Sequence, residues 1–555
     1  MNQGFYKQET AKYADFAENL KKASHKEGAV FDSAEAVDFV EGSIAQAGSN
    51  VPYAVQAVFD DASSAEDKAN IVNAFERGCA AYEAKHGCSV PPDVIESAFH
   101  QAYSTTLGAR SQYRLDAVAD SNHSDPLSLQ PNRAVVAIMT TIAEAIPFAH
   151  YLPADIGSNE AKLAIVTHQA GSAIGGYTKN GSLDGVFSGE SYISTARCHT
   201  VFPTEGEGKI EGKITIAQTD RDHCNQGIEG ARLLRGRAVV YVNGIVAATE
   251  IPSGGAGQAP VSGKVELNGV EYAIGGTIDP DKGVFALTST PALPHTVPVT
   301  VEGFLDVEAD PSLVPTVITS VETYKLYANP WRVNTWQSID TRTQMSNELG
   351  LDPYSESIMA IQSQFANERH YDALAKGIRM AQNMQATFDY SEARKYQDAS
   401  RGEVWRDASS PLRLLDQRMA EATWTHGITH LYVGQKVLSQ ILAMGPDFFV
   451  PSGLTTRPGI FRVGKLFGAY DVYYTPKILG STENSEQILC VGRAPDVARN
   501  PIVLGDAVAP TVMPLAINGD LRQGAGFYAR NFTCVNPHRP SAYGFALLNV
   551  TNLLM

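Results

Sequence analysis

The chain has few cysteines and no long apolar run. Six cysteines among 555 residues are too few for a disulfide framework, which favours a reducing compartment. The best candidate for an apolar run, residues 135–151, is interrupted by Glu144, Pro147 and His150, so no membrane span is expected. The N-terminal residues MNQGFYKQETAKYADF lack the apolar core of a secretory signal. These absences exclude a disulfide-rich secreted domain and disfavour a membrane protein.

Basic residues are also scarce. Lys and Arg together number 44 against 60 Asp and Glu, which gives a formal net charge of −16. Residues 1–130 hold 10 of the basic and 19 of the acidic residues, a net charge of −9. A protein that grips nucleic acid by neutralising phosphates is expected to be basic, so a dedicated DNA-coating function is excluded. The hydrophobic content of 44% predicts an ordered chain, long enough for about three or four domains.

The common nucleotide-binding and nucleophile motifs are missing. Residues 208–209 and 212–213 are Gly-Lys pairs followed by Ile, whereas a phosphate-binding loop needs a hydroxyl residue after the lysine. The glycines within residues 254–257 lie between predicted strands rather than before a helix, and so indicate a plain turn. No Gly-x-Ser-x-Gly motif occurs. We therefore predict no catalytic and no cofactor-binding residue.

One histidine pair has the spacing of metal ligands. His426 and His430 are four residues apart, but Gly427 stands where a zinc peptidase motif has glutamate. The pair also falls where a predicted helix gives way to a strand, so the two rings need not share a face. A structural role is favoured for both histidines.

Two Cys-His pairs could together supply four zinc ligands. Cys198-His199 and His223-Cys224 provide the ligand types of a closed tetrahedral site. Adjacent residues of a strand point to opposite faces, however, and zinc signatures space the ligands of a pair by two to four residues. No metal ligand is therefore predicted, and whether these four residues meet in space is left open.

Residues 1–130 are predicted to be helical. Asp32, with a glutamate three positions later, and Ser64, with an aspartate three positions later, are N-terminal capping patterns. Gly87 follows the second of these helices as a C-terminal cap. A further helix is expected over residues 132–146, where apolar residues recur at helical spacing.

Strand patterns replace helical ones from about residue 160 to residue 330. A glycine-rich stretch, residues 171–189, lies between strand-like segments and predicts a long, bent two-stranded loop. Asn243-Gly244 and Asn268-Gly269 each separate two strand-like runs and predict type I′ hairpin turns. Short strands at this spacing indicate a small β barrel or sandwich.

The C-terminal part combines one very long helix with a compact α/β region. A long β segment over residues 316–328 is followed by a helix from Pro353 to about Met384. A helix of roughly 30 residues is about 45 Å long and is expected to span a whole domain. A second helix begins after Ser410, and residues 428–555 alternate strands with one short helix.

Three stretches, in this order along the chain, carry a family resemblance. Residues 323–352 contain TYKLYA, WQSIDTRTQ and ELGLD; residues 464–476 are GKLFGAYDVYYTP; residues 529–550 are ARNFTCVNPHRPSAYGFALLNV. They resemble the peripheral strand and spine helix, the axial strand pair and the closing strands of tailed-bacteriophage major capsid proteins of the Hong Kong 97 (HK-97) type fold. The resemblance covers roughly residues 130–215 and 316–555.

This resemblance implies an α+β capsid fold. Its parts would be a long spine helix, an axial α/β domain, an extended loop, a helical N-terminal arm and an inserted small β domain. The implied boundaries are 1–150 for the arm, 151–214 for the extended loop, 215–315 for the inserted β barrel or sandwich, 316–410 for the peripheral domain with the spine helix at about 353–384, 411–525 for the axial domain, and 526–555 for closing strands that return to the peripheral domain.

The resemblance also implies a structural function rather than an enzymatic one. Copies would form the hexamers and pentamers of an icosahedral shell that encloses double-stranded DNA in a virion, assembled in the cytoplasm of a host bacterium. The expected partners are other copies, a portal, scaffold or decoration proteins, and DNA held without sequence-specific binding; no membrane, cofactor or metal is expected. The net charge of −16 suits a wall that encloses DNA without gripping it.

Two segments depart from the family pattern, and two other functions stay open. Residues 1–130 and 215–315 are surplus; we expect a retained arm, with no leader removed, and a domain that lies outside the shell or bridges subunits. One alternative function is an encapsulin-like compartment, which shares the fold. The other is a multidomain metal-dependent hydrolase, with ligands drawn from Asp220, His223, Cys224, His426 and His430.

Overall fold

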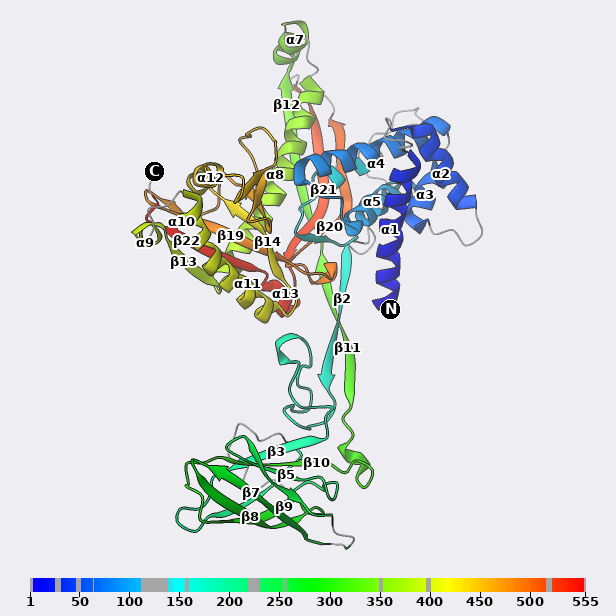
Figure 1. The fold of residues 1–555 in the computed structure, drawn as a ribbon. Helices are drawn as coiled ribbons and strands as arrows, with labels where there is room; N and C mark the ends of the chain where they lie inside the picture. Colours follow the sequence, from blue (N-terminus) through cyan, green and yellow to red (C-terminus); the bar gives the residue numbers. More distant parts are fainter. Residues whose placement is uncertain are drawn as a thin grey trace. The chain divides into compact units, whose positions relative to one another are not determined.

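The chain divides into two compact units, coloured along the sequence in Figure 1. One unit comprises residues 1–165 and 322–555, and the other comprises residues 166–321. The computed structural model describes residues 3–24, 31–45, 51–62, 64–110, 138–139, 141–154, 159–217, 230–252, 255, 257–348, 353–395, 401–515 and 522–553. Within these ranges, no helix is both long and apolar enough to cross a membrane.

The N-terminal segment is helical, as predicted. The Ser64 hydroxyl accepts a hydrogen bond from the Asp67 backbone N–H at 3.1 Å, and Gly87 ends the same helix with a left-handed φ of 68°. Both caps are therefore confirmed. The helices are α1 (Gln3–Ser24), α2 (Ser33–Ala45), α3 (Tyr53–Asp61), α4 (Ala65–His86) and α5 (Pro92–Arg110).

These helices share one hydrophobic core with the C-terminal part of the chain. Phe99 packs against Phe16 and Phe75, with ring centroids 6.2 and 5.6 Å away. The same core includes Tyr473 and Leu504 from the C-terminal sheets. The segment expected as an arm thus packs into the core of the larger unit.

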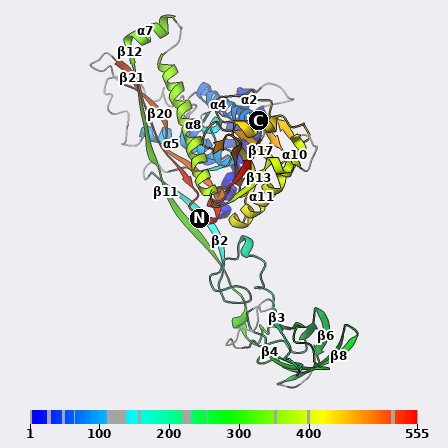
Figure 2. The ribbon, with the colours of Figure 1, turned by 90° about the vertical axis from the view of Figure 1, so that its left-hand side faces the viewer.

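A four-stranded sheet carries the long helix. Its order is β1 (Ala149–Tyr151), β20 (Ile502–Leu515), β21 (Arg522–Val535) and β12 (Asn329–Ser338). The helix α8 (Pro353–Ala381) has 29 residues and is about 44 Å long, which confirms the predicted spanning helix. Phe365 of α8 lies between Trp331 and Phe527, with centroids 5.2 and 5.3 Å away. Figure 2 shows α8 running beside β12 and β21, with α7 (Ile339–Glu348) beyond β12.

A second sheet of the same unit has its own core, to which four of the five helices around it contribute buried residues. Its strands, in order, are β13 (Gln385–Asp389), β22 (Phe545–Thr551), β19 (Ser485–Arg493), β14 (Gly427–Val433), β17 (Tyr470–Tyr474), β16 (Phe461–Leu466) and β15 (Phe449–Pro451), with β18 (Ser481–Thr482) on β19. The helices are α9 (Tyr390–Lys395), α10 (Arg401–Asp407), α11 (Ser409–Thr423), α12 (Gln435–Leu442) and α13 (Arg539–Ala542).

The two closing strands are present, as predicted from the sequence, and they belong to different sheets. Strand β21 pairs with β12, whereas β22 lies between β13 and β19. The sequence predicts both strands but could not assign β12 and β13 as their neighbours, because these two strands lie far earlier in the chain.

A buried carboxylate caps α12 from a neighbouring strand. Glu486 is 4% exposed, and its Oε2 accepts a hydrogen bond from the Val437 N–H at 2.6 Å. The N-cap residue, Gly434, has no side chain that could accept a hydrogen bond from this N–H. We expect Glu486→Ala to lower the free energy of unfolding by about 2 kcal/mol, because a buried N–H loses its acceptor. Urea unfolding measures this.

The matched control for this prediction is an exposed glutamate on α11. Glu421→Ala is expected to change stability by no more than about 0.5 kcal/mol, since Glu421 is exposed. Equal losses for the two variants would contradict a capping role for Glu486.

The unit of residues 166–321 is built on a single eight-stranded sheet. Positive φ values at Asn243 (50°), Gly244 (80°), Asn268 (53°) and Gly269 (79°) confirm the two predicted type I′ turns. The order of strands is β3 (Ala196–Val201), β10 (Val299–Phe304), β5 (Val239–Val242), β6 (Ile245–Glu250), β7 (Ala259–Leu267), β8 (Val270–Asp279), β9 (Val284–Thr290) and β4 (Lys209–Lys213). Strands β3 and β4 precede residue 215, so the sheet begins earlier than the sequence suggested.

Two strands far apart in the sequence form a separate ribbon. Strand β2 (Glu160–Ala170) pairs with β11 (Val317–Tyr327) in a two-stranded sheet. The Gly171 N–H donates to the Thr316 carbonyl at 2.7 Å. The sequence placed a two-stranded loop within residues 151–214 alone; its second strand is instead β11, and the eight-stranded sheet is inserted between the two strands.

Candidate functional site

The histidine pair noted in the sequence is buried, and its two rings have different neighbours. His426, just before β14, donates from Nε2 to the Arg499 carbonyl at 2.8 Å. His430, within β14, lies 2.7 Å from the Thr429 hydroxyl through Nδ1 and 5.7 Å from the Tyr473 ring. Burial lowers the pKa of both imidazoles to about 4. The structure thus gives each histidine a packing role in its own surroundings.

Only one of the two Cys-His pairs lies among the described residues. Cys198 and His199 are neighbours in β3, and only His199 faces the core of the sheet, where its ring lies 5.9 Å from Phe285. His223 and Cys224 lie outside the described residues, as does Asp220. Among the residues that are described, no three His, Cys, Asp or Glu side chains gather in a way that could hold a metal ion.

A buried cluster of imidazoles and phenols joins the N-terminal helices to the body. His86 of α4 lies 2.9 Å from the Tyr473 hydroxyl through Nδ1, and His370 of α8 lies 3.1 Å from the Tyr432 hydroxyl through Nε2. The rings of Tyr432 and Tyr473 stack at 5.2 Å, and His430 packs beside Tyr473. Four elements, α4, α8, β14 and β17, therefore meet at this cluster.

Burial keeps all three imidazoles neutral. It lowers the pKa of His370 to about 3 and that of His430 to about 4, and it holds the pKa of His86 well below its usual value. No sequence signal indicates this cluster, because its histidines share no motif and only the tertiary fold brings them together.

An ion pair holds α5 and α8 against β20. Arg369 of α8 lies 3.1 Å from Asp506 of β20, and Gln101 of α5 donates to the same Asp506 oxygen at 2.7 Å. The Arg369 and Asp506 side chains are only 12% and 2% exposed. Because the charges are buried, this network fixes the two helices on one face of the sheet.

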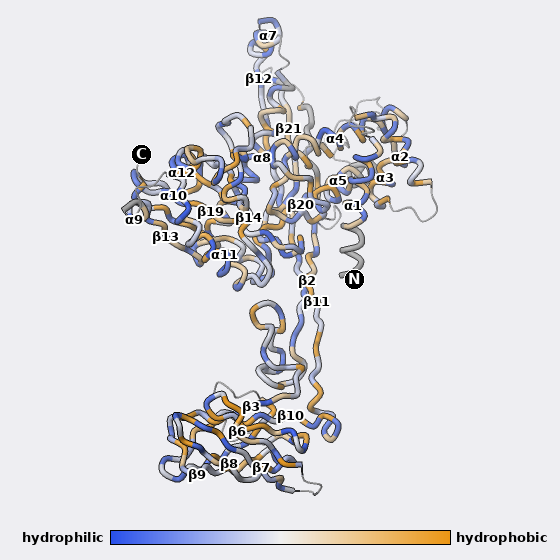
Figure 3. The backbone as a smooth tube through the Cα atoms, viewed as in Figure 1, coloured by the Kyte–Doolittle hydropathy of each residue, from blue (hydrophilic) through white to orange (hydrophobic). Residues whose placement is uncertain are grey.

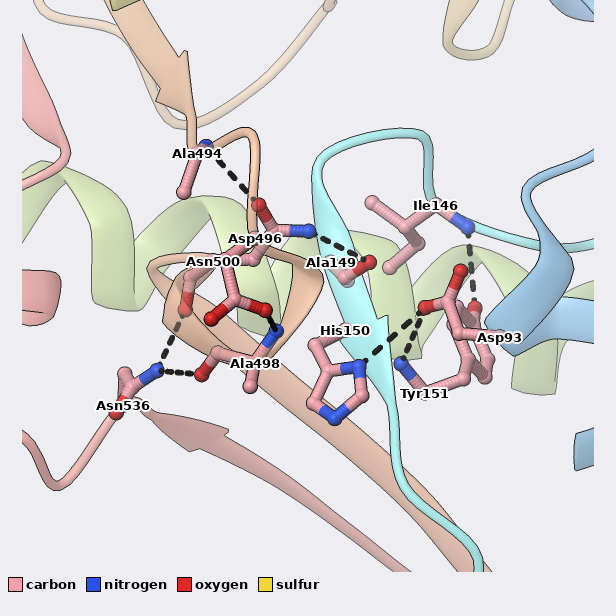
Figure 4. A network of polar contacts seen from close by, with 10 residues as sticks. All are labelled: Asp93, Ile146, Ala149, His150, Tyr151, Ala494, Asp496, Ala498, Asn500 and Asn536. Atoms are coloured by element: carbon pink, nitrogen blue, oxygen red, sulfur yellow. Dashed lines mark hydrogen bonds and ion pairs between the residues drawn. The ribbon is translucent and has the colours of Figure 1, made fainter. Parts of the chain in front are cut away.

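A second polar network holds the short strand β1 from both sides (Figure 4). Asp93 of α5 accepts a hydrogen bond from the Tyr151 N–H at 3.0 Å. On the other side, Asn500 donates to the Ala149 carbonyl at 3.4 Å, and Asn536 donates to the Asn500 carbonyl at 2.8 Å. The N-terminal helices are thus locked to the chain that leads into β20.

The ribbon of β2 and β11 has one covered and one exposed face. Leu163, Ile165 and Leu326 on one face are buried in a small core. On the other face Val317 and Val321 are 53% and 54% exposed, and apolar positions recur along β11 in Figure 3. An isolated two-stranded sheet is only marginally stable in water, and an exposed apolar stretch marks an interaction surface. The ribbon is therefore a candidate surface for assembly.

Comparison with known proteins gives structural similarity only. No family model and no curated protein matches the chain. Among solved structures, the chain is similar to the jumbo bacteriophage PhiKZ capsid, with 9% identity over 73% of this chain and 91% of that one, at a TM-score of 0.37. It is also similar to the capsid of Myoviridae phage XM1, with 8% identity over 59% and 94% of the two chains, at a TM-score of 0.27.

A third similar structure is not a phage capsid. The SrpI encapsulin complex from Synechococcus elongatus PCC 7942 shares 11% identity over 43% of this chain and 78% of that one, at a TM-score of 0.26. Phage capsids predominate among the similar structures, and the TM-scores to PhiKZ, XM1 and SrpI all lie below 0.5.

Proposed function

We propose that this chain is the major capsid protein of a tailed double-stranded DNA bacteriophage. Its copies self-assemble into hexamers and pentamers, which close into an icosahedral shell around the packaged genome. Assembly takes place in the cytoplasm of the host bacterium, and a portal and scaffold or decoration proteins complete the particle. The chain carries out no catalysis.

The ribbon is the observation that supports this proposal best. Each of its strands has 11 residues, a length of about 36 Å at about 3.3 Å per residue. One face exposes Val317, Val321 and Tyr327, which are 53%, 54% and 58% exposed. Ordering such a ribbon in an isolated chain gains little apolar burial, whereas contact with a second copy buries this face. Self-assembly therefore accounts for the ribbon.

The rigid body of the subunit suits the same function. The helix α8 packs along the four-stranded sheet, and the Arg369–Asp506 pair and the imidazole cluster tie the N-terminal helices to it. A shell needs subunits whose contact surfaces keep fixed relative positions, because many contacts form at once. The net charge of −16 favours enclosing DNA over binding it tightly.

We propose further that the inserted sheet lies on the outside of the shell or bridges subunits. This placement follows from its insertion between the two strands of the ribbon, which we assign to subunit contacts. A shell structure with residues 215–315 buried beneath the second sheet of the body would contradict the placement.

The test of the proposed function is assembly of the purified full-length chain. We expect uniform shells, tens of nanometres across, in negative-stain micrographs, and a sedimentation coefficient far above that of a monomer. Val321→Asp is expected to reduce the assembled fraction at least tenfold, because it places a charge on the exposed ribbon face, while circular dichroism stays unchanged.

The control is Val270→Asp, in the hairpin between β7 and β8, where Val270 is 44% exposed. This variant is expected to assemble like the unmodified chain. A monomeric chain containing stoichiometric zinc would overturn the capsid function in favour of the metal hydrolase, and shells that enclose a protein cargo would favour the encapsulin-like compartment.

A further inference from the structure

The C-terminal end of helix α4 contacts strands β16 and β17 of the second sheet. His86, in the last turn of α4, lies 2.9 Å from the Tyr473 hydroxyl of β17 through Nδ1. Gly87 caps the helix with a φ of 68°, and a Cβ atom at this position would clash with the Arg462 guanidinium of β16. We call this contact of residues 82–87 with β16 and β17 the α4 seam.

Helix α5 holds the N-terminal helices to the rest of the unit independently of this seam. Its Gln101 side chain donates to Asp506 of β20 at 2.7 Å. Its Asp93 carboxylate accepts a hydrogen bond from the Tyr151 N–H of β1 at 3.0 Å. Both strands belong to the four-stranded sheet, not to the second sheet. The α4 seam can therefore open while α5 stays in place.

Imidazole and phenol rings meet at the α4 seam. The His86 ring lies 4.4 Å from the Tyr82 ring and 5.8 Å from the Tyr473 ring. Tyr473 also stacks on Tyr432 and packs 5.7 Å from the His430 ring. A contact between aliphatic side chains has no charge to change, whereas an imidazole gains a proton in mildly acidic solution. The strength of the seam therefore depends on pH.

The closed seam disfavours a charged His86. The residue is 2% exposed, and its Nε2 has no hydrogen-bond partner among the described atoms. A protonated imidazole donates from both nitrogens, so protonation would bury a charge together with an unpaired N–H, which is costly. Burial keeps the pKa of His86 well below its usual value, and the backbone of Ala145 opposes this shift only in part.

The charged groups around the seam add to this cost. Lys85, His370 and His430 lower the pKa of this imidazole further. The Asp471 carboxylate already pairs with Arg462 at 2.7 Å, so its charge is balanced without a second cation. The titratable and charged groups that surround the seam are Tyr82, Lys85 and Cys88 at the end of α4, Asp93 of α5, Glu144, which pairs with Lys85, His370 of α8, His430 and Tyr432 of β14, Arg462 of β16, Asp471 and Tyr473 of β17, and Arg493 of β19.

We propose that the α4 seam is an acid-sensitive latch between the N-terminal helices and the second sheet. In mildly acidic solution His86 takes up a proton, and the end of α4 leaves β16 and β17 while α5 stays on β20. The released imidazole then lies in the last turn of an exposed helix end, where a positive charge is favourable. The latch belongs to the single subunit, so it goes beyond the proposed function and does not depend on assembly.

Hydrogen exchange of the full-length chain, followed by mass spectrometry, tests the latch. Between pH 7.5 and pH 5, after correction for the intrinsic exchange rate, the protection of residues 80–86 is expected to fall at least about tenfold, because opening takes up one proton. At pH 5 it is also expected to be at least about tenfold lower than the protection of residues 502–508 in β20, since a local opening costs less than global unfolding. Circular dichroism at both pH values checks that the chain remains folded.

Matched substitutions identify the group responsible. His86→Phe removes the titrating imidazole and keeps a ring, so the protection of residues 80–86 is expected to change by less than about threefold between pH 7.5 and pH 5. His370→Phe, the control, alters a histidine of α8 that stays buried when the seam opens, and is expected to leave the acid-induced loss at residues 80–86 intact. His86→Gln repeats the measurement if phenylalanine prevents folding.

Two results would overturn the latch. One is an equal acid-induced loss of protection at residues 80–86 in His86→Phe and in the unmodified chain. The other is equal protection of residues 80–86 and 502–508 at pH 5, which would mean that the seam opens only when the whole chain unfolds. Shell assembly is measured separately, by sedimentation at pH 7.5, so either result leaves the proposed function intact.

Discussion

Replacing Arg369 by methionine is expected to lower the free energy of unfolding by about 3 to 5 kcal/mol. The arginine lies 3.1 Å from Asp506, whose side chain is 2% exposed. Without Arg369 the aspartate stays buried with only the neutral Gln101 amide as a donor, and an uncompensated buried charge is strongly destabilising. Urea unfolding followed by tryptophan fluorescence measures the loss, because all four tryptophans lie in the unit of residues 1–165 and 322–555.

A second substitution separates the charge from the packing of this site. Arg369→Met combined with Asp506→Asn removes the buried charge and keeps an acceptor for Gln101, so we expect the double variant to be clearly more stable than Arg369→Met alone. The pair of Lys325 and Glu160, 3.1 Å apart, provides the control because the Lys325 side chain is 57% exposed: Lys325→Met is expected to cost at most about 1 kcal/mol. A double variant no more stable than the single one would show that lost packing, and not buried charge, causes the effect.

Acidification from pH 6.5 to pH 5 is expected to destabilise the chain through its buried imidazoles. Burial lowers the pKa of His370 to about 3 and of His430 to about 4, and keeps that of His86 well below the ordinary value. The unfolded chain therefore binds protons near pH 6.5 that the folded chain does not bind, so stability falls as the pH falls. His370 and His430 each cost about 2 kcal/mol over this interval, at about 1.4 kcal/mol per pH unit, and His86 adds to the loss in the same direction.

The loss attributable to one histidine is isolated by comparing two pH profiles. His370→Phe removes one titrating group, so its loss of stability between pH 6.5 and pH 5 is expected to be about 2 kcal/mol smaller than that of the unmodified chain. His295, exposed in the turn before β10, is the control, and His295→Phe is expected to leave the slope unchanged. Parallel profiles for His370→Phe and the unmodified chain would contradict neutral burial of His370.

Local features of the fold could be predicted from the sequence. The caps at Ser64 and Gly87 depend on residues within one helix, and the turns at Asn243-Gly244 and Asn268-Gly269 depend on two adjacent residues that tolerate positive φ. The helix α8 shows its apolar spacing within its own 29 residues. The residues that make up each of these signals are close together along the chain, so the feature can be predicted without knowing the tertiary fold.

Contacts between distant residues could not be predicted. The pairing of β2 with β11 joins Gly171 to Thr316, and nothing in either strand specifies the other, since many β segments could pair with each. The imidazole cluster depends on where α4, α8 and β14 pack against one another. The residue pattern within any one of these elements does not determine this packing. The candidate assembly surface on the ribbon could not be predicted for the same reason: the exposure of Val317 and Val321 is decided by the fold.

The hydrogen bond between Gly171 and Thr316 also has a consequence for how the chain folds. The ends of β2 and β11 can meet only after the intervening residues have brought them together, and closing so long a loop carries an entropic penalty that grows with the logarithm of its length. The sheet of residues 166–321 relies on short hairpins such as β7–β8, which form from local contacts and so form fast. We therefore expect the inserted sheet to form first and to bring the ends of β2 and β11 together, so that the ribbon forms after the sheet.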